Sequence, residues 1–148
     1  MNAVAQREEW RALLQRMLAC LRRSRETPLQ FEIDAGGIVA AALADASSAV
    51  ARDQAGAESA LNELIEDLLG VERGVSFAPE AVRPAGLAAW LARVYRTLRA
   101  VHPATIDILA LRLDGLEDRA IAGRLHLGLR LVRQITRETR ADWESETA

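Results

Sequence analysis

Apolar residues in this sequence recur at intervals of three and four, the spacing that places side chains on one face of an α-helix. Between residues 7 and 23 this face comprises Trp10, Leu13, Leu14, Met17, Leu18 and Leu21. The same spacing returns over residues 58–69 and again over residues 87–98. No stretch alternates apolar and polar residues as a half-buried strand would. The sequence therefore predicts an all-α protein.

Capping residues and helix breakers set the expected boundaries of these helices. Pro28 lies in a polar stretch that ends the first helix. Asp34 is a usable N-cap for a second helix that runs to about Arg52. Gly70 is the expected stop of the third helix, and Pro103 is expected at the first position of a later one.

The chain has 148 residues, of which 50% are apolar and 27% are charged. This balance allows a packed core in one domain or in two small helical ones. Helix-breaking residues gather at Gly70, Gly74, Pro79 and Pro84. We therefore expect a helical module over residues 1–75, a linker over residues 76–84 and a second helical domain over residues 85–148.

Several classes of function are disfavoured by the sequence. Cys20 is the only cysteine, and His102 and His126 are not spaced with other ligands as a metal site requires. No nucleotide-binding fingerprint or catalytic cluster is present, so we expect no metal, no cofactor and no enzymatic activity. No apolar run approaches the length that crosses a membrane, and the first residues lack a signal-peptide core. We expect a soluble, cytoplasmic protein without membrane contact.

Residues 111–140 match the demands of two short helices that cross at a steep angle. Such a pair needs a small residue at the crossing, which Ala122 supplies, and apolar residues at fixed offsets on both helices. Those apolar residues are Leu116, Ile121, Leu125, Leu127, Val132 and Ile135. The pattern predicts a helix-turn-helix, supported by a core that also includes Trp90, Leu91, Val94, Leu109 and Leu113.

This stretch resembles region four of the sigma-70 family, most closely that of the extracytoplasmic-function sigma factors. The matching elements are Leu111-Arg112-Leu113, Asp114-Gly115-Leu116, Ile121-Ala122, Arg124-Leu125 and Val132-Arg133, and the resemblance covers residues 98–143. Response regulators of the LuxR type use a similar helix-turn-helix, so the motif is moderately specific. The resemblance implies a transcription regulator that binds double-stranded DNA.

Three features of the motif differ from the family pattern, and one of them is that Leu129 and Leu131 open the second helix, where polar residues are usual. His126 occupies the turn position usually held by Gly, where a left-handed backbone costs about 1 kcal/mol for another residue. Gly128 offers an alternative position for that turn. Glu117 and Asp118 replace the usual Ser or Thr as caps of the first helix.

The resemblance implies that a recognition helix over about residues 128–140 enters the major groove. The candidate DNA-binding residues on it are Arg130, Arg133, Gln134, Arg137 and Arg140. Arg pairs bidentately with guanine and Gln with adenine. Residues 121–140 contain five Arg and one acid, Glu138, so their local charge is +4, whereas the whole chain carries −2.

The N-terminal half leaves two interpretations open. Residues 34–39 faintly resemble the start of sigma region two, which implies RNA polymerase as a partner. Residues 1–75 are otherwise an unrelated helical module. The alternative for the whole chain is a protein-interaction module that keeps the helix-turn-helix fold without binding DNA. Its partner would be polymerase, an anti-sigma-like protein or a second copy in a homodimer, and Leu129 and Leu131 are its candidate contacts.

Overall fold

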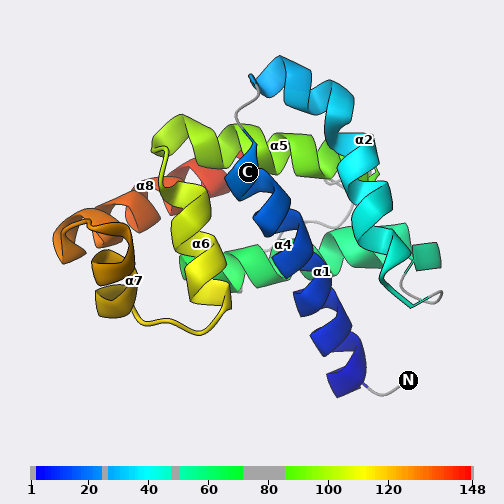
Figure 1. The fold of residues 1–148 in the computed structure, drawn as a ribbon, viewed down its shortest axis with the longest axis horizontal. Helices are drawn as coiled ribbons and strands as arrows, with labels where there is room; N and C mark the ends of the chain where they lie inside the picture. The colour runs from blue at the N-terminus through cyan, green and yellow to red at the C-terminus, as the bar shows by residue number, and fades with distance from the viewer. Residues whose placement is uncertain (1–2, 25–26, 48–50, 72–85, 148) are drawn as a thin grey trace. The chain divides into compact units, whose positions relative to one another are not determined.

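A computed structural model describes residues 3–24, 27–47, 51–71 and 86–147 of the chain (Figure 1). All regular secondary structure within these ranges is α-helical, which confirms the all-α prediction. The helices are α1 (Ala3–Arg23), α2 (Pro28–Ala44), α4 (Gln54–Leu69), α5 (Leu87–Val101), α6 (Thr105–Leu113), α7 (Asp118–Leu125) and α8 (Leu129–Thr147). None of these described helices is long and apolar enough to cross a membrane. The expected linker over residues 76–84 lies outside the described residues.

The chain divides into two compact units. The first unit comprises Met1–Leu64 and Pro84–Arg96, and the second comprises Ile65–Arg83 and Thr97–Ala148. The division falls inside α4 and inside α5, because each of these helices contributes residues to both units.

Large apolar side chains form the interior of the first unit. The α1 stripe foreseen from the sequence is buried along its whole length, and α1 packs against α2. Phe31 of α2 stacks on Tyr95 of α5 with ring centroids 4.0 Å apart, and both rings are fully buried. Trp90 is also buried and donates its indole N–H to the Oδ1 atom of Asn62. This interior is held mainly by apolar burial.

The helix α2 begins earlier than expected, so the prediction that Asp34 is its N-cap is wrong. Pro28 is the first helical residue, and the Oγ1 atom of Thr27 accepts a hydrogen bond from the Gln30 amide at 3.3 Å. Pro at this position has a backbone already suited to a helix start and lacks the N–H that would go unpaired. The expected end at Arg52 is also wrong, because the helix stops at Ala44.

In the second unit, the three consecutive helices α6, α7 and α8 pack against one another. Their shared core consists of Ile108, Leu111, Ile121, Ala122, Val132 and Ile135, all buried. Half-buried leucines surround this core, and Leu129 and Leu131 are among them. The small side chain of Ala122 lies in the core as the sequence predicts, which is consistent with close approach of two helix backbones there.

Several expected helix ends in the second unit can be compared with the structure. Gly70 terminates α4 with φ +74°, in agreement with the sequence. The prediction for Pro103 is wrong, because α6 begins two residues later at Thr105. The helix α8 continues to Thr147, beyond the expected end at Arg140. Trp143 lies in this extension, where it is buried and donates its indole N–H to Glu66 of α4 at 3.3 Å.

Candidate nucleic-acid interface

The inner face of α8 fixes which side chains can point outward. Val132, Ile135, Thr139 and Trp143 follow one another at intervals of three and four, and all four are buried. Within the first of these intervals, Arg133 and Gln134 fall on the opposite face of the helix and are exposed. The burial of one face therefore directs Arg133 and Gln134 toward solvent.

A tight left-handed turn joins α7 to α8. His126 follows the last residue of α7 and adopts φ 56° and ψ 40°, and its amide donates to the Ala122 carbonyl. The next amide, that of Leu127, donates to the same carbonyl at 2.9 Å. Gly128 does not take the left-handed conformation, so the alternative that the turn shifts to this glycine is wrong.

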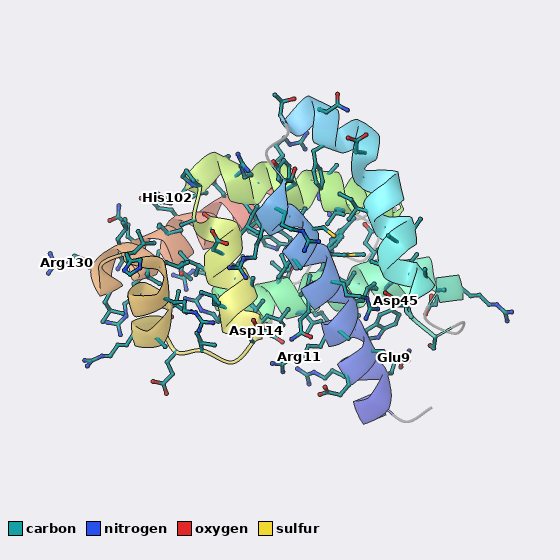
Figure 2. The ribbon with its side chains drawn as sticks, viewed as in Figure 1. Glu9, Arg11, Asp45, His102, Asp114 and Arg130 are labelled. Atoms are coloured by element: carbon teal, nitrogen blue, oxygen red, sulfur yellow. The ribbon has the colours of Figure 1, made fainter. Side chains whose placement is uncertain are left out.

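Four of the five candidate residues are exposed on α8: Arg130, Arg133, Gln134 and Arg137. Figure 2 shows the Arg130 side chain pointing away from the helices at the start of α8. Arg130 and Arg137 have no hydrogen-bond or ion-pair partner in the part of the chain that the structure describes. Spacings of three, one and three residues place these four side chains on one helix face.

The fifth candidate, Arg140, differs from the other four. It is half-buried, and its Nη1 atom lies 3.5 Å from the position that a Cβ on Gly70 would occupy. The structure therefore brings this guanidinium near the end of α4 and does not group it with the exposed face of α8.

The N-terminal end of α7 is not capped by a side chain, contrary to the expectation for Glu117 and Asp118. Glu117 occupies the N-cap position without a side-chain hydrogen bond. Asp118 instead accepts a hydrogen bond from the Nη2 atom of Arg112 at 2.7 Å through its Oδ1 atom. Its Oδ2 atom lies 3.7 Å from the Nε atom of Arg133. Asp118 therefore pairs with two arginines.

Arg112 connects four elements of the second unit. Its Nη1 atom donates to the Leu68 carbonyl at the end of α4 at 2.9 Å. Its Nη2 atom donates to Asp118 of α7 and, at 3.1 Å, to the Oγ1 atom of Thr136 of α8. Only 17% of its side chain is exposed, and its two Nη atoms donate to three oxygens.

Charges on the exposed face favour an anion. Arg119 and Arg124 of α7 are exposed as well, and no acidic residue lies in the first turn of α8. The nearest acid on the outer face of α8 is Glu138, whose Oε1 atom accepts a hydrogen bond from Gln134 at 3.1 Å. The free amides at the helix start add partial positive charge next to Arg130. This surface therefore suits a negatively charged partner better than a positively charged one.

Other groups with chemical potential lie elsewhere. Among the described residues, no group of three or more His, Cys, Asp and Glu side chains could hold a metal ion. Glu58 of the first unit is 4% exposed, and its burial raises the pKa of the carboxyl group although Arg93 and the Gly86 amide act to lower it. Its Oε2 atom has no hydrogen-bond partner among the described residues.

The sequence alone did not indicate the pairing of Arg112, Asp118 and Arg133. Arg112 precedes Asp118 by six residues across a turn, and a spacing of this kind carries no helical signal. The exposure of Arg119 and Arg124, in contrast, is predictable from the helical pattern of α7, since Ile121 and Ala122 mark its buried face.

Comparisons with protein-family models, with curated proteins and with solved structures found no match for this chain. The resemblance to the sigma factors therefore depends on the motif in residues 98–143.

Proposed function

We propose that the protein is a cytoplasmic, non-enzymatic transcription regulator that binds double-stranded DNA through α7 and α8, in the manner of sigma region four. In this proposal α7, the His126 turn and α8 form a helix-turn-helix, and α8 lies in the major groove. Arg130, Arg133, Gln134 and Arg137 contact the duplex, and Arg140 has a packing role.

The observation that carries the proposal is the exposure of Arg130, Arg133 and Arg137 on α8. Arg130 and Arg137 are exposed and without partners among the described residues, although the chain as a whole is slightly acidic. The exposed pair of Arg133 with Asp118, with 59% of the Arg133 side chain accessible, is worth only about 0–1 kcal/mol. A phosphate or a base edge can therefore compete for each of these three guanidinium groups.

The test is binding of the full chain to fluorescent duplexes of mixed sequence and about 30 base pairs, followed by anisotropy between about 50 and 200 mM salt. Arg130→Ala and Arg137→Ala are combined in one variant. If both residues contact phosphates, affinity falls for all sequences and the salt slope drops by about one for each lost contact.

Arg52→Ala supplies the matched control for the Arg130→Ala single variant, because Arg52 is exposed, belongs to the first unit and its replacement also removes one positive charge. A double variant that binds as tightly as the wild type would remove α8 from the interface. Equal losses in the control and in an Arg130→Ala single variant would indicate an effect of total charge alone.

The alternative is a helical interaction module that binds polymerase, an anti-sigma-like protein or a second copy of the chain. Leu129 and Leu131 favour it, because both pack on the core of the second unit and yet remain half-exposed. Under this alternative the wild type shows no salt-dependent binding to duplexes. Leu131→Ser would instead change the sedimentation of the chain or its binding to purified polymerase.

A further inference from the structure

We propose that Arg133 reads a guanine and that Asp118 is the residue that positions it, held in turn by Arg112. The inference rests on the proposed function, because it assigns base recognition within the same surface. It separates the arginines of α8 into one that specifies sequence and others, Arg130 and Arg137, that contact the backbone.

The Nε side of the Arg133 guanidinium group faces the carboxylate of Asp118. Its Nε atom lies 3.7 Å from the Oδ2 atom of Asp118, and its two Nη atoms have no partner among the described residues. A guanidinium group is planar and presents its donors in fixed directions. When the Nε edge faces a carboxylate, the two Nη groups remain available together at the far end.

Asp118 is itself held in place. Its other oxygen, Oδ1, accepts from Arg112 at 2.7 Å, and Arg112 is 17% exposed and also bound to Leu68 and Thr136. The carboxylate is therefore held by a contact to Arg112 that does not involve Arg133. Arg130 and Arg137 have no such carboxylate among the described residues, so their side chains retain more rotamers.

The chemistry of guanine fits the donors that remain on Arg133. The O6 and N7 atoms of guanine are adjacent acceptors in the major groove, and two donors of one arginine can bind both of them. An arginine whose plane is already oriented loses less entropy on forming this pair than a free one. A phosphate accepts a guanidinium in many orientations and gains less from such positioning.

Asp118→Asn separates the two roles of the carboxylate. The Asn carbonyl can still accept from Arg112, which keeps the half-buried guanidinium paired, while the amide group presents donors instead of an acceptor to Arg133. Glu117→Gln is the matched control. It removes the same charge at the neighbouring position, and the Glu117 side chain makes no capping hydrogen bond. Arg133→Lys keeps the charge and removes the planar fork.

The experiment selects bound duplexes from a randomised pool with the full chain and sequences them. Affinities are then measured for the enriched site and for the same site with the guanine replaced by adenine. The wild type and Glu117→Gln should prefer guanine at one position by about tenfold to a hundredfold. Asp118→Asn and Arg133→Lys should lose most of this preference and keep the salt-dependent binding. Thermal unfolding confirms that each variant is folded.

Three outcomes would overturn the inference. If Asp118→Asn binds all sequences more tightly and keeps the guanine preference, Asp118 only neutralises Arg133. If the preference disappears equally in Glu117→Gln, it depends on net charge. If the wild type binds duplexes and enriches no sequence, DNA binding stands and base reading by Arg133 does not. Absence of any binding to duplexes would instead remove the proposed function together with the inference.

Discussion

The two units differ in whether a charged side chain that is shielded from solvent has its hydrogen-bonding partners. In the second unit, Arg112 donates to oxygens of α4, α7 and α8, and its charge is compensated by Asp118. In the first unit, Glu58 is more deeply buried, and one of its oxygens has no partner among the described residues. Desolvation of the carboxylate there outweighs the opposing effect of Arg93.

The difference follows from what holds each unit together. Phe31, Trp90 and Tyr95 give the first unit a large apolar interior, which stabilises the fold without directional contacts. In the second unit the short helix α7 buries only Ile121 and Ala122, and the hydrogen bonds of Arg112 to Asp118 and Thr136 add directional contacts that its few apolar contacts do not provide. A surface that must present α8 in one orientation benefits from such directional contacts.

The largest expected effect is at Arg112. Arg112→Met keeps the approximate length of the side chain and removes its donors, which leaves the Leu68 carbonyl without this partner and the half-buried Asp118 with only the more distant Arg133. We expect the free energy of unfolding to fall by about 2–3 kcal/mol, measured by denaturant titration. Arg119→Met, on the exposed surface of α7, should change it by less than about 0.5 kcal/mol. Similar losses in both variants would show that Arg112 has no special structural role.

The fold was predictable where the periodicity was strong and less so where it was interrupted. Buried residues from Trp10 to Leu21 and from Leu87 to Leu98 follow the helical spacing closely, and α1 and α5 could be located from it, although α1 begins at Ala3 and not near residue 7. The sequence favours too late a start for α2, because Pro28 is typical of a helix end, whereas Thr27 before it is the N-cap that the structure shows. Because proline lacks a backbone N–H, it occurs both just after the end of a helix and at the first position of one. A capping residue before the proline distinguishes a helix start from a helix end.

The candidate site was predictable in its outline. Helical spacing correctly placed Arg130, Arg133 and Arg137 on the exposed side of α8, since Val132 and Ile135 had to face inward. It gave no indication that Arg140 would be half-buried beside Gly70, because that proximity joins residues of α8 to the end of α4. The partners of Asp118 were missed for the same reason, since tertiary contacts leave no periodic trace in a sequence.

A smaller effect is expected at His126, where the second unit holds a non-glycine residue at positive φ. In the first unit, the described residue with a positive φ is a glycine, Gly86. His126→Gly removes the steric cost of the left-handed conformation and should stabilise the protein by up to about 1 kcal/mol, observed as a rise in Tm. Gly128→Ala is the companion variant, because Gly128 has no positive φ and no atom lies within 4 Å of an added Cβ. A loss of stability in Gly128→Ala would mean that the turn forms at Gly128 in solution.

The smallest effect is expected at Glu58, because the attraction of Arg93 offsets part of the desolvation that acts on the carboxylate. Its folded-state pKa is raised above the ordinary value of 4.5, so the folded state binds the proton more tightly than the unfolded state does. The protonated group therefore contributes stability that is fully present below pH 4.5 and is lost as the pH rises through the raised pKa. Glu58→Gln imitates the protonated form and should be more stable than the wild type at neutral pH, with a difference that shrinks as the solution is acidified.

Glu63→Gln controls for the loss of the same charge, because Glu63 is exposed on the same helix. Denaturant titrations at several pH values should give a growing stability gain for Glu58→Gln alone as the pH rises. If Glu58→Gln is instead less stable than the wild type at neutral pH, the attraction of Arg93 outweighs the desolvation. The first unit would then compensate its buried charge as fully as the second unit does, and the contrast between Glu58 and Arg112 would disappear.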